Sequence, residues 1–490
     1  MAAQVTYMPD DAGYRKQLAA RQNAGYRWQL FFLGATLVGL VVLVVLLLSI
    51  LNQTFGLIAV RQKIDPATLT NGRAMTELSA VELSDILETN LSKGKLQGAF
   101  LTLVTGTDID RGKLGTEPLG DLLPTLVFAE GLGAKKFTEL TPEDLGQIIA
   151  DNTSQDVLVN YVNREVVGRE VLQNWSLIDS LFNRAAIEQL VKDKAEGKGF
   201  SNTLTAAQLD EQKAAFASAH LEMHSWLSGE FLNEPNSTVA SDAGIRGGLI
   251  GTLWVISLTM LFATPLGVGA AIYLEEYAKD GIFARNAFLK RVNAIIETNI
   301  RNLAGVPSII YGLLGLALFA RLLLPLTSGA IFGVENGRGN TILSASLTLA
   351  LLILPVIIIN AQEAIRAVPR SIREGSYGMG ATKWQTVSRQ VLPAAIPGIM
   401  TGIILSLSRA VGETAPLVVI GAAVFLSKDP NGPFQPFTTL PIQIFNWTEQ
   451  PSDQFRAAAA AGIIVLLAML LVLNASAIIL RQRFSRRLQG

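Results

Sequence analysis

Six long apolar runs constrain this chain more than any other feature of its sequence. Five of them contain no charged residue, and they cover 28–60, 247–274, 302–320, 339–362 and 457–480. The sixth, 394–425, is apolar except for Arg409 and Glu413. A helix needs about 20 consecutive apolar residues to cross a hydrocarbon core about 30 Å thick. The sequence therefore predicts six membrane-spanning helices.

The composition agrees with a membrane protein and excludes several other classes. Only 16% of the residues are charged, whereas a soluble domain carries about 25%. Lys and Arg together number 40, as do Asp and Glu, so no basic field points to nucleic acid. Cysteine is absent, which excludes a disulfide framework, a cysteine-ligated metal and a thiol nucleophile.

The basic residues predict that both chain ends are cytoplasmic. They are concentrated in residues 1–27, in the loops after the second and fourth spans, and in residues 481–490. Because cytoplasmic loops carry an excess of Lys and Arg, both terminal tails are expected in the cytoplasm and residues 52–244 outside it. The first span, 28–51, is expected to be an uncleaved anchor, since it is longer than a signal peptide core and no cleavage site follows.

The chain is therefore divided into an anchor, a polar domain at 52–244 and a bundle of five further spans at 245–480. We expect the polar domain to be α+β, with both short strands and amphipathic helices. The expected strands cover 55–64 and 99–104, and the expected helices cover 80–91, 177–194 and 206–227.

The segment between the second and third spans carries a helical pattern of its own. In residues 282–299, Phe288, Val292 and Ile295 recur at helical spacing among basic residues. This pattern indicates an amphipathic helix on the cytoplasmic surface of the membrane. An ordinary connecting loop is the alternative.

The third span contains a helix breaker and several small residues. Pro307 is expected to break the helix, while Gly305, Gly312 and Gly315 allow a neighbouring helix to approach closely. We interpret these glycines as packing residues rather than as contacts for a transported molecule.

The loop after the fourth span, residues 363–393, is longer than an ordinary connection of about 4–6 residues. It retains a helix-forming stretch around Glu374, and Gly380 follows at a place where a glycine ends a helix. The pattern predicts a short helix that projects from the membrane into the cytoplasm. A charged surface loop is the alternative.

Two charges interrupt the apolar run at 394–425. A charge near the centre of a span costs about 2.5–3.5 kcal/mol, so Arg409 and Glu413 are candidates for a functional site. Their spacing of four places both on one face of a helix, where they can pair. A guanidinium binds an oxyanion through two parallel hydrogen bonds, so Arg409 is expected on an anion path. The alternative is a buried pair that only fixes helix packing.

The loop at 363–393 resembles the loop that permeases of type I ABC importers present to their ATPase. The resemblance rests on Glu374, on Gly380 six residues later and on Leu392-Pro393. It implies that Glu374 and Gly380 are coupling residues on a helix that sits in a cleft of the nucleotide-binding subunit. Three positions depart from the alanines and the isoleucine that are usual in the family, namely Gly375, Ser376 and Gln390.

Residues 405–417, Leu-Ser-Leu-Ser-Arg-Ala-Val-Gly-Glu-Thr-Ala-Pro-Leu, are similar to the signature of phosphate-specific permeases, and of the PstA type in particular. The likeness covers about residues 245–480. It implies an all-α bundle in the bacterial inner membrane that moves inorganic phosphate from periplasm to cytoplasm by alternating access. It places Arg409 and Glu413 on the transport pathway. The anchor and the polar domain resemble a long variant of this subunit.

The resemblance also implies partners for the chain. These are a second permease subunit of related fold (PstC type), an ATPase dimer (PstB type) and a periplasmic phosphate-binding protein (PstS type). The chain contains no Gly-Lys-Ser/Thr segment of a phosphate-binding loop. ATP and magnesium are therefore expected on the partner ATPase, and the chain itself is expected to be neither an enzyme nor a cofactor-binding subunit.

One pair of histidines has the spacing of a metal site. His220 and His224 lie one turn apart in the expected helix at 206–227. The glutamate between them is misplaced for a His-Glu-x-x-His metalloprotease helix, and no third ligand is evident. We expect an exposed helical pair that binds no metal.

Three other functions remain open at this point. The chain could be a permease for another oxyanion such as sulfate, molybdate or phosphonate, because one arginine does not choose among them. It could be a receptor that senses a ligand through residues 52–244, or a passive channel. Neither a receptor nor a channel needs a helix that docks an ATPase.

Overall fold

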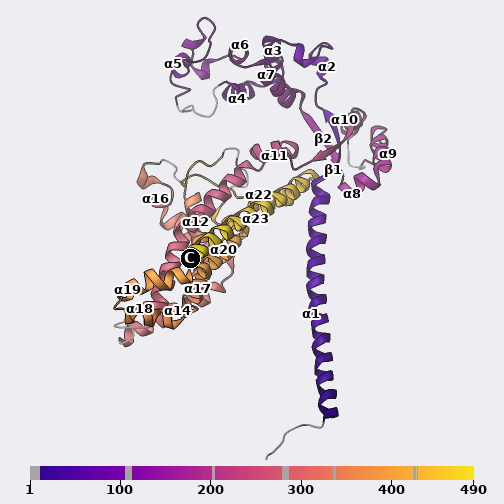
Figure 1. Ribbon diagram of the computed structural model, residues 1–490. Helices are drawn as coiled ribbons and strands as arrows, with labels where there is room; N and C mark the ends of the chain where they lie inside the picture. Colours follow the sequence, from indigo (N-terminus) through magenta and orange to yellow (C-terminus); the bar gives the residue numbers. More distant parts are fainter. Residues whose placement is uncertain are drawn as a thin grey trace, which may run out of the picture. The chain divides into compact units, whose positions relative to one another are not determined.

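The structure, a computed structural model, describes residues 11–104, 113–200, 205–278, 286–334, 338–422, 426 and 429–489 (Figure 1). It contains two compact units. Gly56–His224 forms the smaller one, and Met1–Phe55 together with Ser225–Gly490 forms the larger one. Two basic residues of the loop after the second span that support the predicted orientation, Lys279 and Arg285, lie outside the described residues.

The predicted anchor is part of a single long helix, α1 (Asp11–Thr54). Its candidate span, Leu18–Thr54, has no buried residue in its apolar window. Trp28 and Phe31 meet edge to face near the start of the apolar part, with their ring centroids 5.8 Å apart. An apolar helix whose side chains all face outward is stable only in hydrocarbon or against another helix, as a membrane span requires.

The smaller unit contains a three-stranded sheet in the order β2-β1-β3. The central strand β1 (Phe55–Gln62) pairs antiparallel with β2 (Arg169–Asn174), and β3 (His220–Ser225) lies on its other side. The β1 residues from Leu57 to Val60 are almost fully buried. This burial explains why β1 reads as a continuous apolar run rather than as an alternating one.

The rest of the smaller unit is helical and has its own hydrophobic core. Leu83, Leu87, Phe100, Leu145 and Ile148 are all inaccessible to solvent in this core. Its main helices are α3 (Ala80–Asn90), α4 (Lys93–Leu103), α6 (Pro142–Asn152) and α7 (Gln155–Val162). Helix α3 begins at a capping box of Ser79 and Glu82. Hydrogen bonds from the Ser79 backbone and the Arg73 side chain lower the pKa of Glu82 to about 2.

Three of the predicted elements in this unit are corrected by the structure. The expected strand at 99–104 is wrong, because Leu96, Ala99 and Phe100 are buried together on one face of α4. The expected helix at 177–194 is interrupted at Asn183, which separates two shorter helices. The expected helix at 206–227 ends early and is followed by a strand. The observed helices are α8 (Leu177–Phe182), α9 (Arg184–Ala195) and α10 (Ala206–Ala217).

The last of these corrections also changes the histidine pair. His220 and His224 lie on β3 rather than on a helix. Within the part of the chain that the structure describes, no group of three or more His, Cys, Asp or Glu residues could hold a metal ion.

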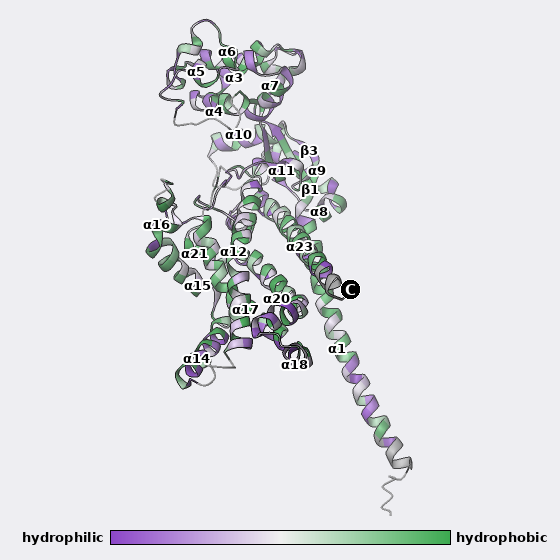
Figure 2. Cartoon of the chain, turned by 60° about the vertical axis from the view of Figure 1, so that its left-hand side comes forward, coloured by the Kyte–Doolittle hydropathy of each residue, from purple (hydrophilic) through white to green (hydrophobic). Residues whose placement is uncertain are grey.

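The larger unit is a bundle built around α17 (Ile342–Arg366). In its most apolar stretch about 67% of the α17 residues are buried, which makes α17 the central helix. The corresponding values are 33% for the candidate span Arg246–Tyr277 and 0% for the candidate span Asp453–Arg483. Figure 2 shows the hydrophobic colour dominating α17, α20 and α23. The helices around α17 are α12 (Arg246–Ile272), α15 (Ser308–Gly315), α20 (Leu392–Gly412) and α23 (Asp453–Gln489).

Among the described residues, five helices are long and apolar enough to cross a membrane, and a sixth span results if one bent pair is counted. The bent pair joins α14 (Ala287–Ala304) to Ser308–Leu322 at 110°. The break falls at Gly305 to Pro307, where the sequence predicted it. The predicted class, a helical membrane bundle with an α+β domain, is confirmed.

The amphipathic segment before this break is a helix and not a connecting loop. Helix α14 has no buried residue, and Phe288 and Ile295 are largely exposed. Residues 282–285 of the expected range lie outside the described residues. Figure 1 places α14 at the same end of the bundle as α18 (Arg370–Gly378) and α19 (Lys383–Thr386).

The segment that follows the smaller unit packs on the opposite end of the bundle. Trp226, Phe231 and Ile245 form one core cluster with α22 (Leu440–Glu449) and the start of α23. The indole Nε1 of Trp447 donates to Asn236 Oδ1 at 3.3 Å, and Gln443 Nε2 donates to the Gly244 carbonyl at 2.7 Å. Residues 225–245 therefore belong to the bundle and not to the smaller unit.

Two of the three glycines in the third span pack as expected. A Cβ at Gly312 would lie 2.7 Å from Pro416 Cα and 3.0 Å from Val419 Cβ. A Cβ at Gly315 would collide with the side chain of Thr348. Gly305 has only the Asn302 carbonyl of its own helix nearby, at 3.5 Å, so it does not act in packing.

We predict that Gly312→Val destabilises the bundle, because the new side chain meets the backbone of Pro416 and overpacking costs about 1–3 kcal/mol. Thermal unfolding of the detergent-solubilised protein measures the effect as a lower midpoint. Gly269→Ala is the matched control, since no atom lies within 4 Å of a Cβ there. Equal midpoints for both variants would contradict the close approach of the two helices.

Candidate functional site

The loop after α17 forms the short helix that the sequence predicts. Helix α18 covers Arg370–Gly378 and begins directly after Pro369, which cannot continue α17. At its end Gly380 has φ +83°, a conformation that only glycine adopts without strain. The Gly380 amide donates to the Tyr377 carbonyl at 2.9 Å, and the Ala381 amide donates to the Ser376 carbonyl at 3.2 Å. These two hydrogen bonds form a Schellman cap.

The outer surface of this loop combines a carboxylate with large apolar side chains. Glu374 is exposed and has no hydrogen bond or ion pair within the described residues. Met379 is 90% exposed and Trp384 is 62% exposed. Met379 also lines an open hollow of about 660 Å³, together with Gly375, Gly380 and Arg389 among others. Exposed apolar groups of this size next to an unpaired charge are typical of a surface that binds another protein.

The chain returns from this loop to the membrane through a well-defined turn. Thr382 and Gln385 form a capping box at α19 (Lys383–Thr386). The hydroxyls of Ser376 and Thr386 lie 2.9 Å apart, which connects α18 to this return segment. Buried Val387 and Val391 then lead into α20. These contacts join α18 to the segment that precedes α20.

The intramembrane charges lie at the other end of α20. The guanidinium of Arg409 donates from Nε to Glu413 Oε1 at 3.2 Å, so the two charges pair as predicted. The side chain of Glu413 is 17% exposed and that of Arg409 is 39% exposed. Arg409 lies in the last turn of α20, where the negative end of the helix dipole stabilises a cation.

The expectation that both charges lie on one helix face needs a correction. Helix α20 ends at Gly412, and Glu413 already has extended backbone angles, φ −76° and ψ 117°. Pro416 follows within three residues and lies in the first turn of the separate helix α21 (Ala415–Ile420), so α20 does not continue through this segment. In the described part of the predicted span, 394–422, the helix is thus broken, and the charge pair lies at the break.

Further polar groups lie near the break. Ser408 Oγ donates to Asn474 Oδ1 of α23 at 2.8 Å. Ser406 Oγ is buried and has no hydrogen-bond partner among the residues that the structure describes. Among the described residues, the side chain of Arg409 makes one hydrogen bond, which Nε donates to Glu413. Its two Nη groups are therefore available to donate to another molecule. The arrangement can present a guanidinium fork to an oxyanion.

The structure therefore groups the candidate residues into two separate places. Glu374 and Gly380 lie in the loop before α20, and Arg409 and Glu413 lie at its C-terminal end. Helix α20 has 21 residues, which at a rise of about 1.5 Å per residue separates the two places by about the thickness of the hydrocarbon core.

Comparison with known proteins shows the family of this chain. Residues 281–490 match the family described as binding-protein-dependent transport system inner membrane component. The chain is 32% identical over 265 residues to the probable ABC transporter permease protein YqgI of Bacillus subtilis. The aligned region covers 52% of this chain and 83% of that relative. The chain belongs to the permease subunits of ABC transporters.

Two further relatives carry phosphate transport in their names. Phosphate transport system permease protein PstA 1 of Mycobacterium tuberculosis is 32% identical, with 50% of this chain and 72% of the relative covered. Phosphate transport system permease protein PstC of Pasteurella multocida is 34% identical, with 47% and 73% covered. The comparison with a solved structure of the methionine ABC transporter MetNI covers 50% of this chain and 95% of the solved chain. The two chains are 20% identical, and the TM-score is 0.35.

Within that class the chain belongs to the Pst-type permeases. Family membership has three consequences for the chain. It is a multi-pass protein of the inner membrane and a permease subunit of an ABC importer complex. It is not an enzyme, because a separate ATPase hydrolyses ATP in this family.

We predict that Gly380→Ala loosens the cap of α18, because an L-residue in this conformation costs about 1 kcal/mol. Hydrogen exchange measures the effect at the amides of residues 380 and 381, which should exchange roughly fivefold faster. Gly378→Ala is the matched control, since that glycine is helical and no atom lies within 4 Å of a Cβ. Unchanged protection in Gly380→Ala would show that the cap does not depend on the glycine.

Proposed function

We propose that this chain is the PstA-type membrane subunit of an ATP-driven importer of inorganic phosphate. The observation that carries the proposal is Arg409, a guanidinium at a helix break inside an otherwise apolar run, with its Nη groups free of partners in the described residues. Phosphate is an oxyanion that such a fork binds through two hydrogen bonds. Relatives of both the PstA and PstC types support the substrate by their names.

The proposed transport mechanism is alternating access. ATP binding closes the partner ATPase dimer, and this closure displaces α18 through Glu374 and Gly380. Helix α20 moves with α18 because the return segment joins them through Ser376 and Thr386. The Arg409 end of α20 then exposes phosphate to one side of the membrane and afterwards to the other. Each state must differ in its affinity for the ATPase or the binding protein, since otherwise nothing drives the change.

Glu413 has a defined part in this mechanism. It holds the Arg409 side chain at the helix break through one hydrogen bond to Nε. Its negative charge also weakens the binding of phosphate enough for release, because a second anion beside the guanidinium competes for it. Release matters as much as binding in a transporter.

The proposed complex contains a second permease of the PstC type, a PstB-type ATPase dimer and a PstS-type periplasmic phosphate-binding protein. ATP and magnesium bind to the ATPase, and this chain binds neither. Both termini lie in the cytoplasm, so α18 and α14 face the ATPase side. Residues 52–244 then lie in the periplasm, and the importer function belongs to residues 245–480.

A permease for sulfate, molybdate or phosphonate is the second candidate, because all of these ligands present oxygens that Arg409 could bind. A receptor that senses through residues 52–244 and a passive channel have less support. Neither of them accounts for a loop that exposes the carboxylate of Glu374 together with the large apolar side chains of Met379 and Trp384.

We predict that Glu374→Lys abolishes phosphate uptake in a strain that lacks the native subunit, because it reverses the charge that α18 presents to the proposed ATPase. The variant protein should still insert into the membrane and assemble with its partner permease. Thr298→Lys is the control, since it adds a charge on α14, another exposed helix. Normal uptake by Glu374→Lys would refute the coupling role, and failure of the wild-type chain to recruit an ATPase would refute the importer itself.

We predict that Arg409→Gln lowers phosphate uptake at least about tenfold while the complex still forms, because the charged fork for the anion is lost. Arg409→Lys should retain part of the uptake, since it keeps the charge but not the planar fork. Uptake of labelled phosphate by whole cells gives the measurement. If Arg409→Gln and Glu413→Gln lowered uptake equally and also lowered the yield of assembled complex, the pair would be structural and the pathway role would be refuted.

A further inference from the structure

Two adjacent acidic residues end the first span of the bundle. Glu275 and Glu276 lie in η6 (Tyr273–Tyr277), a π-helical turn that continues α12. The side chain of Glu276 is only 7% exposed. A carboxylate buried at the end of a membrane helix requires partners inside the protein.

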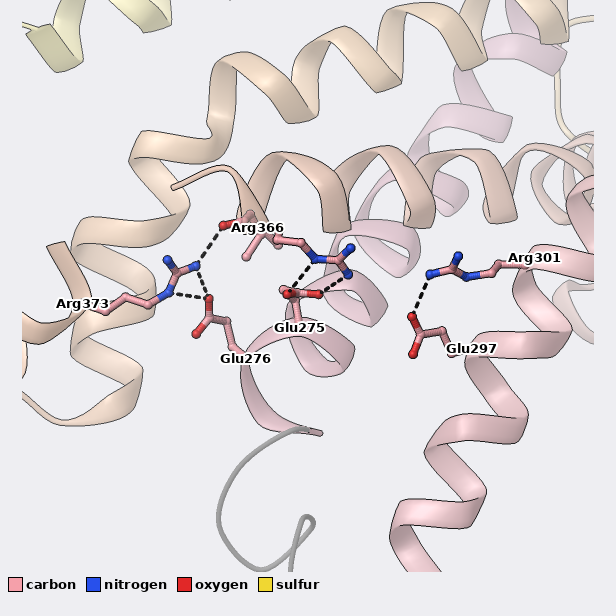
Figure 3. A network of polar contacts seen from close by, with 7 residues as sticks. Glu275, Glu276, Glu297, Arg301, Arg366 and Arg373 are labelled. Atoms are coloured by element: carbon pink, nitrogen blue, oxygen red, sulfur yellow. Dashed lines mark hydrogen bonds and ion pairs between the residues drawn. The ribbon is translucent and has the colours of Figure 1, made fainter. Parts of the chain in front are cut away.

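The partner of Glu276 comes from the loop helix α18. Arg373 donates to Glu276 Oε1 from Nη2 at 2.7 Å and from Nε at 3.1 Å. The two residues are 97 positions apart in the sequence, and Figure 3 shows them facing each other between the ribbons. The side chain of Arg373 is itself only 17% exposed.

Arg373 also binds the end of the central helix. Its Nη1 donates to the Val368 carbonyl at 2.7 Å, and its Nη2 donates to the Ile365 carbonyl at 2.9 Å. One guanidinium thus connects α18 to the ends of both α12 and α17. These contacts use both of its Nη nitrogens and Nε, a geometry that lysine cannot reproduce.

A second ion pair lies next to the first but is more exposed. Arg366 donates to Glu275 from Nη2 at 2.9 Å and from Nε at 3.2 Å, which joins α17 to α12 (Figure 3). The side chain of Arg366 is 52% exposed. This pair does not involve α18, so it provides a natural comparison for the pair that does.

The position of Arg373 on α18 separates two functions of that helix. Arg373 points inward to the bundle, whereas the next residue, Glu374, is exposed. Between α17 and α18 the chain passes through Pro369 without regular helix. A helix attached only through such a connection could turn without moving the spans, and the Arg373 contacts prevent this.

We propose that Glu276 and Arg373 are positioning residues that fasten the coupling helix to the cytoplasmic ends of α12 and α17. A displacement of Glu374 is then transmitted to two membrane helices instead of being absorbed at Pro369. This inference rests on the proposed function, because it assumes that an ATPase moves α18. It adds two residues that the sequence did not single out, and their contacts explain how the motion reaches the bundle.

The test uses the complete complex in proteoliposomes and measures phosphate uptake and ATP hydrolysis in the same preparation. Glu276→Gln and Arg373→Gln should each lower the phosphate moved per ATP at least about tenfold, because either change leaves a buried charge without its partner. The ATPase should still co-purify and hydrolyse ATP. The double variant should be no worse than either single one, since both act through the same contact. Glu275→Gln is the matched control and should retain most of the coupling.

A second measurement tests directly whether α18 is held to α12, and it does not depend on transport. Because the chain contains no cysteine, spin labels can be introduced at Ser371 on α18 and at Leu266 on α12, both of which are exposed. The distance distribution between the labels should be narrow in the otherwise wild-type protein and in Glu275→Gln, and broad in Glu276→Gln.

The outcomes of the two measurements distinguish the inference from the proposed function. A narrow distribution in Glu276→Gln, or an unchanged ratio of phosphate to ATP, would overturn the positioning role. Parallel loss of uptake and ATP hydrolysis with a narrow distribution would also overturn it. If the wild-type complex moved no phosphate, the proposed function would fail, and the distance measurement would still decide whether Glu276 fastens α18.

Discussion

A charged side chain in the bundle of this protein is costly within the membrane unless another group pairs with it, because hydrocarbon offers no partner. The described ion pairs at the ends of the spans follow this constraint. Glu276 and Arg373 meet at the end of α12, and Arg409 and Glu413 meet where α20 breaks. Both pairs lie where the helical hydrogen bonding changes, in a π-helical turn in one case and at a helix end in the other. The irregular backbone and the charges therefore occur together.

Helix α20 connects the loop that is proposed to bind the ATPase with the helix break that is proposed to bind the anion. Its N-terminal end follows the loop that carries Glu374, and its C-terminal end carries Arg409. The loop helix α18 is held to α12 and α17 by Arg373 and to the return segment by Ser376. In the proposed mechanism, motion at the exposed face of α18 reaches α12, α17 and α20 through these contacts. The coupling and the anion site form one mechanical unit in this account, although no residue belongs to both.

Much of the bundle could be predicted from the sequence because its signals are local. Apolar length gave the spans, and Gly380 marked the end of α18 by a conformation that a single residue determines. The end of α20 at Gly412 was missed because the apolar pattern continues across it, and the two strands β2 and β3 were missed because their pairing is set by the distant β1. The Glu276–Arg373 pair was missed for the same reason, since nothing in either segment indicates a partner far along the chain.

The central claim is that ATP hydrolysis by a partner subunit drives phosphate transport through this bundle. Uptake of labelled phosphate into proteoliposomes that contain the chain, its partner permease, the ATPase and the binding protein tests it most directly. The account predicts accumulation that requires enclosed ATP and that persists in an excess of sulfate or molybdate. Uptake without ATP, or uptake that sulfate or molybdate suppresses as well as unlabelled phosphate does, would contradict it.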